Sequence, residues 1–298
     1  MKCFYHSADL DGHCSGAIIK KFNPKVELIG YNYGQEFPWD SIQPGEQVFM
    51  VDVSLPMPQM YKLASMGTLY WIDHHISAIN DHEEQAARED WSIKGLRRTD
   101  RAACELCWEW CAHHEPVPPV VYYLGIYDSW RFEDYEERVV KAFQYGMRTL
   151  KETRPEHSMM VWEGFFSAKT EQETILQEIF TRGRTIFDYQ LVQNEKTCRA
   201  CAFETDLHDY AEESFLKCIA VNSNLGNSDV FRSVYDPEKH DAMLIFYRSK
   251  RGFWRVSIYS THEEVDCSRY AKAFDGGGHK GAAGFQCQEL PFELTKMD

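Results

Sequence analysis

A histidine and two carboxylates stand close together near the start of the chain, in the stretch His6-Ser7-Ala8-Asp9-Leu10-Asp11-Gly12. They follow a short apolar run. Asp is common in turns and at helix N-caps, and Asp11, directly before Gly12 and a helical segment, is an obvious cap candidate. Carboxylates that crowd together also raise one another's pKa unless cations offset their charge. The stretch is therefore a candidate metal site as well as a candidate helix start.

More acids and histidines follow apolar runs further along the chain. Asp52 stands in MVDVS, Asp73, His74 and His75 stand in WIDHH, and Asp128 follows VVYYLGIY. In an open parallel sheet, ligand-binding groups collect beyond the carboxyl ends of the strands. We therefore expect one shared rim to carry His6, Asp9, Asp11, Asp52, His74, His75 and Asp128.

The elements that must position these residues alternate between strand-like and helix-like segments. Strands are expected at residues 2–5, 47–53 and 69–72, with helices at residues 12–22, 56–65 and 101–114. This alternation predicts an α/β fold whose parallel sheet has helices on both faces.

A second, smaller α/β domain is expected in the C-terminal part of the chain. Strand-like runs occur at residues 218–221, 242–247 and 254–259, after a charge-rich helical stretch. A length of 298 residues suits two domains. We expect them at residues 1–180 and 196–298, joined by a helical linker at 181–195.

The chemistry of the acid and histidine set points to hard divalent cations. Its ligands are oxygens and a few imidazoles without thiolates, which suits Mn²⁺, Mg²⁺ or Fe²⁺ better than a structural zinc site. The number of ligands is enough for two ions, about 3.5–4 Å apart, bridged by a carboxylate and a water. Such a pair lowers the pKa of the bridging water and clamps phosphoryl oxygens, which predicts hydrolysis of a phosphate ester.

A glycine-rich run near the C-terminus, GGGHKGAAGF at residues 276–285, is the second candidate site. Glycines allow backbone N–H groups to form an anion-binding nest, although such a run is a tight turn about as often. Lys250, Arg251 and Arg255 could add cations, or they could line a solvated strand edge. Arg255 is the strongest of the three because strand alternation places it on the same side as Ser257 and Tyr259.

Composition limits the classes of partner and compartment. A net charge of −14 repels a long polyanion, so any nucleic-acid ligand should be short, and no long duplex is expected. The sequence contains neither a signal peptide nor an apolar span, which predicts a cytoplasmic protein without a membrane partner. Oligomerisation stays open.

The ten cysteines are expected to be reduced thiols. Cys104, Cys107 and Cys111 have the spacing of a buried helix stripe, which favours core packing over metal binding. Cys198 and Cys201 form a C-x-x-C pair that could join them in a zinc site, and this is the weaker reading.

The combined motifs resemble the DHH phosphoesterases with their associated C-terminal domain. The resemblance rests on H-x-x-D-x-D-G at residues 6–12, the isolated Asp52, the DHH triplet at residues 73–75, Asp128 in YDSW, and GGGHKGAAGF. It implies that His6 and Asp9 hold one metal, that Asp11, His74 and Asp128 hold the other, and that Asp52 bridges. The ions implied are manganese, and the active site implied lies in the cleft between the two domains.

The same resemblance assigns the remaining residues. His75 would face the substrate phosphate, and Asp73 would orient a ligand imidazole. Gly276, Gly277, Gly278 and His279 would bind a phosphate or the terminal nucleotide. Tyr259 stands where many members have arginine, and Arg255 could replace that contact. The short spacing between His6 and Asp9 looks more like the branch of small oligoribonucleases related to nanoRNases.

The leading hypothesis is a phosphodiesterase acting on very short RNA or linear dinucleotides, or a phosphatase acting on a 3′,5′-bisphosphonucleotide. A polyphosphatase or pyrophosphatase comes second, because a chain of phosphates requires many cations and the protein has 32 basic against 46 acidic residues. A nucleotide sensor without turnover is a third reading, although every expected metal ligand is present.

Overall fold

The computed structural model describes residues 1–113, 115–167, 169–209, 214–224 and 226–294. The chain forms two units, residues 1–187 and 188–298, and they divide within the long helix α8 (Lys169–Cys201). Within the described part of the chain, no helix is both long enough and apolar enough to cross a membrane.

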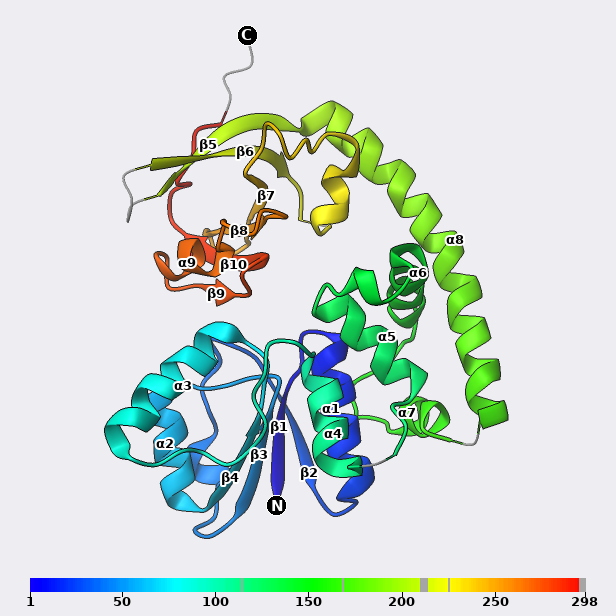
Figure 1. Ribbon diagram of the computed structural model, residues 1–298, viewed down its shortest axis with the longest axis vertical. Coiled ribbons are helices and arrows are strands. Elements are labelled where there is room, and N and C mark those ends of the chain that lie inside the picture. The colour runs from blue at the N-terminus through cyan, green and yellow to red at the C-terminus, as the bar shows by residue number, and fades with distance from the viewer. Residues whose placement is uncertain (114, 168, 210–213, 225, 295–298) are drawn as a thin grey trace. The chain divides into compact units, whose positions relative to one another are not determined.

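The first unit contains a four-stranded sheet in the order β2-β1-β3-β4, and all of its strands are parallel (Figure 1). Successive side chains of a strand point to opposite faces, so both faces are apolar. Tyr5 and Val51 pack into the core on one face, and Phe4 and Met50 pack into the core on the other. The strands are β1 (Lys2–His6), β2 (Glu27–Tyr31), β3 (Gln47–Val51) and β4 (Thr68–Ile72).

Helices cover both faces of this sheet, as the alternation in the sequence predicted. Side chains of α1 (Leu10–Phe22) and α4 (Ala103–Ala112) share the core that contains Tyr5. Those of α2 (Met57–Met66) share the core that contains Phe4, and α3 (Ile76–Glu89) lies against α2. The rest of the unit includes η1 (Trp39–Ser41), α5 (Pro119–Asp128), η2 (Phe132–Asp134), α6 (Glu137–Met147) and α7 (Met160–Phe165).

The strand expected at residues 47–53 ends at Val51, because Asp52 turns the chain with a φ of +58°. Asp tolerates this left-handed conformation better than most residues. The apolar run before Asp128 forms helix α5, so Asp128 is the last residue of a helix and not a strand-end residue. The expected helix at residues 101–114 is α4, shorter at both ends, and residue 114 lies outside the described residues.

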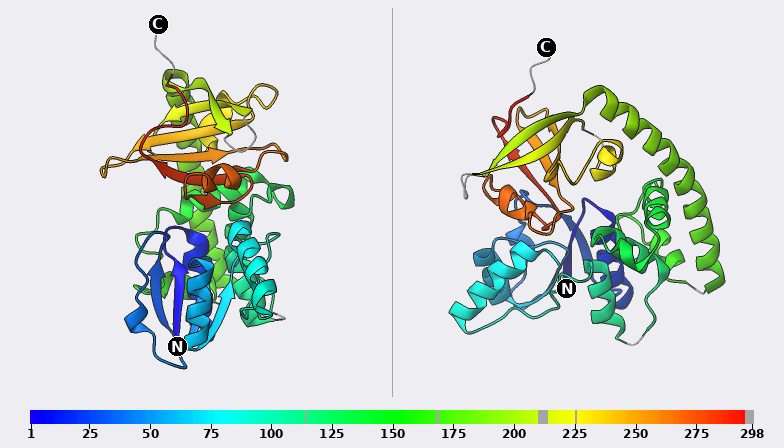
Figure 2. Two further views of the ribbon diagram at one scale, coloured as in Figure 1. Left: turned by 90° about the vertical axis from the view of Figure 1, so that its left-hand side faces the viewer. Right: turned by 45° about the horizontal axis from the view of Figure 1, so that its top comes forward.

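The second unit is built on a six-stranded mixed sheet in the order β5-β6-β7-β8-β10-β9 (Figure 2). Side chains of α9 (Cys267–Lys272) pack on one face, and Cys198 of α8 with the helix η3 (Ser228–Ser233) packs on the other. The strands are β5 (Phe203–Asp209), β6 (Ser214–Asn222), β7 (Ala242–Arg248), β8 (Trp254–Tyr259), β9 (Gly277–Gly278) and β10 (Ala282–Cys287).

All ten cysteines are free thiols. Cys104 and Cys107 are buried in the core between α1 and α4, and Cys111 packs against it. Cys198 is buried in the second unit, where its Sγ lies 2.9 Å from the carbonyl oxygen of Val230. No group of described side chains with metal-ligand geometry includes a cysteine. The stripe on α4 is therefore core packing.

Candidate metal centre

The loop after β1 turns sharply and brings Asp9 back to His6 at the end of the strand. His6 is the last residue of β1, and Asp9 caps α1 by accepting a hydrogen bond from the Gly12 N–H at 3.0 Å. A Cβ atom on Gly12 would lie 1.9 Å from the carbonyl oxygen of His6, so only glycine fits this return of the chain. The turn places Asp9 Oδ2 3.0 Å from His6 Nδ1.

Of the two roles that the sequence left open for Asp11, the cap of its own helix is excluded, because Asp9 occupies the N-cap of α1. The buried carboxylate of Asp11 lies instead at the start of α4, where it accepts hydrogen bonds from Ala103 N–H at 2.9 Å and Cys104 N–H at 2.8 Å. The N-terminal N–H groups of a helix have no partner within the helix and favour a negative charge. Asp11 is thus fixed by an element about 90 residues away in sequence.

The triplet at residues 73–75 forms a compact turn between β4 and α3. Asp73 is fully buried, and its Oδ1 accepts hydrogen bonds from His74 N–H at 2.7 Å and from Nδ1 of His75 at 2.7 Å. Its Oδ2 accepts a hydrogen bond from the indole N–H of Trp71 at 2.9 Å. Burial opposes ionisation of Asp73, but its contacts with His75 and His74 hold its pKa below the usual value.

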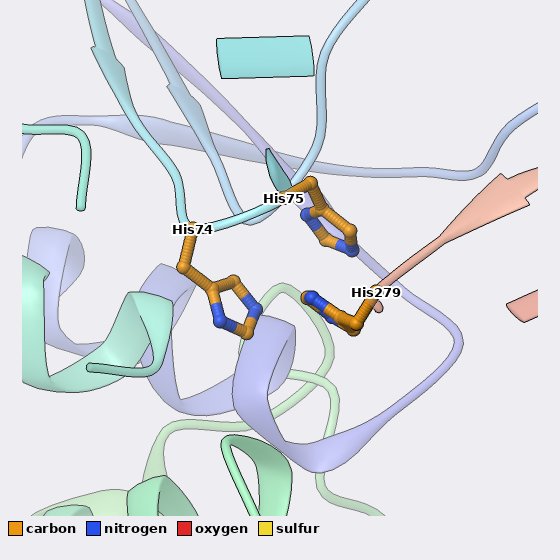
Figure 3. A group of neighbouring side chains, drawn as sticks. All are labelled: His74, His75 and His279. Carbon is orange, nitrogen blue, oxygen red and sulfur yellow. The ribbon is translucent and has the colours of Figure 1, made fainter. Parts of the chain in front are cut away.

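The two histidine rings project from this turn (Figure 3), with their centroids 4.9 Å apart. His74 is almost completely buried and points its Nε2 at three carboxylates. The distances are 3.2 Å to Asp128 Oδ2, 3.3 Å to Asp52 Oδ1 and 3.6 Å to Asp11 Oδ2. Helix α5 therefore brings Asp128 to the same place that β3 and β4 reach from the sheet.

Six of the sequence-predicted residues thus meet beyond the carboxyl ends of β1, β3 and β4. We call them the rim cluster: His6, Asp9, Asp11, Asp52, His74 and Asp128. Asp52 belongs to two groups of potential ligands whose donor atoms lie within 4.8 Å of one another, one with His6 and Asp9, the other with Asp11 and His74. Asp52 also lies near Asp73 and His75 in a third such group.

The electrostatics of the rim cluster reflect concentrated negative charge. Burial, together with Asp52 and Asp128, raises the pKa of Asp11 well above its usual value. Burial raises the pKa of Asp128 to about 7, with Asp9 and Asp52 adding to the effect and His74 opposing it. Burial lowers the pKa of His6, but its contacts with Asp52 and Asp9 outweigh this and raise the pKa to about 11.

The donor set fits divalent cations. Within the described part of the chain, the buried atoms Asp52 Oδ1 and His6 Nδ1 make no hydrogen bond of acceptable geometry, although His74 Nε2 lies 3.3 Å from the first and Asp9 Oδ2 lies 3.0 Å from the second. Buried polar atoms are rarely left without a partner unless they serve a function such as binding an ion. Four carboxylates and two imidazoles supply oxygen and nitrogen ligands without thiolate, a combination that suits Mg²⁺ or Mn²⁺. The assignment of each ligand to a particular ion stays a prediction.

The glycine-rich run folds into the connection from α9 to β9 and a tight β9–β10 hairpin. Gly278 has a φ of +143°, and a Cβ there would lie 2.6 Å from the Ala282 carbonyl oxygen. The N–H of Gly276 donates to Ala271 at 2.9 Å, and that of His279 donates to Ala282 at 2.7 Å. Two of the N–H groups expected in an anion-binding nest are therefore used within the turn. The proposed phosphate contact of this run stays a prediction.

The strand register locates the two other residues singled out in the second unit. Tyr259 pairs with Ala282 at the tip of the hairpin, and the exposed Arg255 pairs with Gln286. Tyr259 follows Arg255 by four positions, which is about 13 Å along a strand. The guanidinium of Arg255 lies 3.4 Å from the Tyr247 hydroxyl. Tyr259, and not Arg255, therefore lies beside the hairpin tip. That tip carries His279, whose side chain is drawn in Figure 3.

Two positioning residues of the first unit were missed from the sequence. Trp71 holds Asp73 through its indole N–H. The sequence signal for this contact was that Trp71 comes two residues before Asp73, which places both side chains on the same side of the extended chain. His13 lies with Nε2 3.1 Å from the Ser7 carbonyl oxygen and with Nδ1 2.9 Å from the Thr153 hydroxyl, and so supports the loop after β1. Its partner Thr153 is 140 residues away, and no sequence pattern connects the two.

No protein-family model matches the chain. The uncharacterized protein R106 of Acanthamoeba polyphaga mimivirus is 23% identical over 270 residues, which are 88% of this chain and 58% of that protein. The chain thus spans less than two thirds of the length of this curated relative.

Three solved structures are similar to this chain over most of its length. The DHH domain of a member of the s1p family of ribosomal proteins matches with a TM-score of 0.54 at 12% identity, over 95% of this chain and 81% of that one. The pGpG-specific phosphodiesterase PggH from Vibrio cholerae matches at 0.48 and 12% identity, over 96% and 92% of the two chains. An exopolyphosphatase-related protein from Bacteroides fragilis matches at 0.45 and 14% identity, over 97% and 87%. The first of these likenesses confirms the two-domain α/β fold that the motifs predicted.

Proposed function

We infer that this chain, which has the fold of a DHH-domain protein, is a phosphoesterase of the DHH family that uses two divalent cations. The observation that carries this inference is the position of Asp52 between the two ligand groups of the rim cluster. One carboxylate that serves two neighbouring sets of ligands is the arrangement that a paired metal site requires. The buried acids supply the negative charge that two cations would balance.

The residues of the first unit would divide the work as follows. His6 and Asp9 would hold one ion, Asp11, His74 and Asp128 the other, and Asp52 would contact both. Bound cations of this kind polarise phosphoryl oxygens and lower the pKa of a water molecule. The carboxylate of Asp73 accepts a hydrogen bond from Nδ1 of His75, and this bond fixes the orientation and tautomer of the His75 ring. His75 would then contact an oxygen of the scissile phosphate.

The proposed substrates are short oligoribonucleotides, linear dinucleotides or a 3′,5′-bisphosphonucleotide. The net charge of −14 supports small substrates over long nucleic acids, because only the metals and local cations offset the repulsion. Gly276–His279 of the second unit would bind the end of the substrate remote from the reacting phosphate, and Arg255, which lies further along β8, would offer a separate cation. Mn²⁺ is the proposed cation, with Mg²⁺ or Fe²⁺ as the alternatives.

A substrate panel tests this proposal. Di- to pentaribonucleotides, linear and cyclic dinucleotides, 3′-phosphoadenosine 5′-phosphate and polyphosphate would be assayed with Mn²⁺ and with Mg²⁺. We expect metal-dependent hydrolysis of at least one of the short nucleotide substrates and none after chelation. Faster phosphate release from polyphosphate would favour the exopolyphosphatase alternative. Tight nucleotide binding without any turnover would favour a sensor and contradict the proposal.

A further inference from the structure

An aromatic side chain outside the recognised motifs lies beside the rim cluster. The ring centroid of Tyr33 is 5.7 Å from that of His6 and 6.0 Å from that of His75, with interplanar angles of 65° and 76°. Both contacts are therefore of the edge-to-face kind, which aromatic rings favour. Tyr33 is still 52% exposed after making them. Its ring touches two residues of the proposed reaction site and keeps surface for a ligand.

The backbone around Tyr33 forms a turn that is held by hydrogen bonds. Gln35 N–H donates to the Asn32 carbonyl oxygen at 3.2 Å, and the Gln35 side chain accepts from Asn32 N–H at 2.9 Å. The Tyr31 hydroxyl donates to the Gln35 carbonyl oxygen at 3.0 Å. Gly34 has a φ of +80°, which a side-chain residue would adopt only with strain. The turn therefore fixes the position of Tyr33 before any ligand arrives.

The same turn is connected to the first metal-binding motif. Asn32 Oδ1 accepts hydrogen bonds from Ser7 N–H at 3.1 Å and from the Ser7 hydroxyl at 3.2 Å. Ser7 lies between His6 and Asp9 in the loop after β1. These hydrogen bonds fix the turn of Tyr33 relative to the loop whose residues would bind the first metal. A ligand that contacts Tyr33 therefore lies at a defined distance from that metal site.

We propose that Tyr33 is a stacking platform for the base of a nucleotide, and that it makes the site select nucleoside-containing phosphates over base-free ones. This inference rests on the proposed function, because it takes the rim cluster as the site that binds the phosphate. Every base has a flat π-face, and stacking on an aromatic side chain contributes to binding without reading sequence. A polyphosphate chain would gain nothing from an uncharged ring at this place, because it requires cations. Because the turn already orders the region around the ring, the entropic cost of binding a base there is smaller.

The experiment compares two ligands that differ only in the base. Adenosine 5′-monophosphate and ribose 5-phosphate are titrated into the full chain with Mn²⁺, and their dissociation constants are measured by calorimetry. We expect the parent protein to bind the nucleotide about tenfold more tightly than the sugar phosphate. Tyr33→Leu should reduce this preference to less than twofold, whereas Tyr33→Phe, which keeps the ring, should retain it.

A matched control and a folding control accompany these variants. Tyr189→Leu replaces a tyrosine of α8 that is 65% exposed, and it should retain the preference of the parent. Circular dichroism melting of each variant checks that the fold is intact, and Tyr33→Phe tests the ring even if the leucine variant melts early. The proposal is overturned if Tyr33→Leu keeps the parent preference, or if Tyr33→Phe loses it, since the hydroxyl would then be the contact.

The outcome is separable from that of the proposed function. Binding preference is measured without turnover, so a protein that binds nucleotides through Tyr33 but hydrolyses nothing would support the stacking role and contradict the phosphoesterase. A parent protein that hydrolyses phosphoesters but binds the two ligands equally would support the phosphoesterase and contradict the stacking role.

Discussion

The rim cluster of the first unit lies beyond the ends of strands, and the β9–β10 hairpin of the second joins two strands, but side chains form the first and the backbone forms the second. The rim cluster consists of side chains that come from β1, α1, α5 and the turns after β3 and β4, and they meet in a largely buried space. The hairpin is shaped by its backbone, with glycine required at Gly278 and internal hydrogen bonds at Gly276 and His279.

This difference determines what a substitution does in each region. In the rim cluster, the side chain itself is the functional group, and its removal should affect metal binding before it affects the fold. In the hairpin, a substitution first changes the backbone, so an effect on ligand binding there follows from an effect on conformation. The following experiments test that distinction.

The largest effect is expected for Asp52→Asn. Asparagine keeps the shape of the side chain and tolerates the left-handed backbone, but it removes the charge shared by the two ligand groups. We expect kcat/KM on the best nucleotide substrate to fall at least about 1000-fold, which is roughly 4 kcal/mol. We also expect Mn²⁺ to raise the melting temperature of the parent protein and not that of the variant.

Asp40→Asn is the matched control, because Asp40 is an exposed carboxylate of η1 in the same unit. It should leave both kcat/KM and the metal-induced rise in melting temperature unchanged. If Asp52→Asn kept a tenth of the parent activity, or melted with the same dependence on Mn²⁺, the central role of Asp52 would be lost.

The next effect concerns a buried histidine away from the rim cluster. His82 accepts a hydrogen bond from Ile93 N–H through Nε2, and burial together with Arg97 lowers its pKa to about 4. In the unfolded chain His82 binds a proton as the pH falls below about 6.5, whereas in the folded chain it stays neutral until the pH approaches 4. His82 therefore contributes its full stability above pH 6.5, and this is lost as the pH falls towards 4, with a loss on the order of 3 kcal/mol.

Urea unfolding of the parent protein and of His82→Gln between pH 4 and pH 7.5 measures this contribution. Glutamine can accept a hydrogen bond but does not titrate, so the variant should lose less stability than the parent between pH 6.5 and pH 4. Equal pH dependence of the two proteins would contradict a lowered pKa of His82 in the folded chain.

A pair of glycine substitutions tests the hairpin. Gly278→Ala forces a side chain into a positive φ and against the Ala282 carbonyl oxygen, and it should lower the free energy of unfolding of the second unit by about 2 kcal/mol. Gly277→Ala places its Cβ in open space and should change stability by less than about 0.5 kcal/mol. Thermal unfolding of both variants measures the difference. Equal destabilisation would mean that backbone shape does not distinguish these glycines.

The smallest effect is expected for Trp71→Phe, which removes the indole N–H that holds Asp73 and keeps an aromatic ring in the core. Asp73 would then hold His75 less firmly. We expect kcat to fall about tenfold, or 1.4 kcal/mol, while KM changes less than threefold. Trp39→Phe, outside the rim cluster, is the control for the exchange of ring type. A change confined to KM, or equal losses in both variants, would argue against this positioning role.

Much of the first unit was predictable because local patterns are sufficient there. The alternation of apolar runs and helical segments predicted the parallel sheet, and the rule that ligand-binding groups lie beyond strand ends predicted that His6, Asp52 and His74 would meet. Asp128 reached the same place by a different route, as the end of helix α5. The sequence left the cap of helix α1 open as an alternative role for Asp11, and it could not show that Asp11 contacts the N–H groups of α4, which are far away in the sequence.

The sequence by itself determined which chemical groups are present, their order, and the strands and helices that carry them, because periodicity and turn residues act over a few positions. Only the tertiary structure decided that Asp52 is shared between two ligand groups, that α4 holds Asp11, and that Tyr33 lies against His6 and His75. Those contacts join segments that approach one another only after the sheet and its helices have packed. No local pattern of residues specifies them.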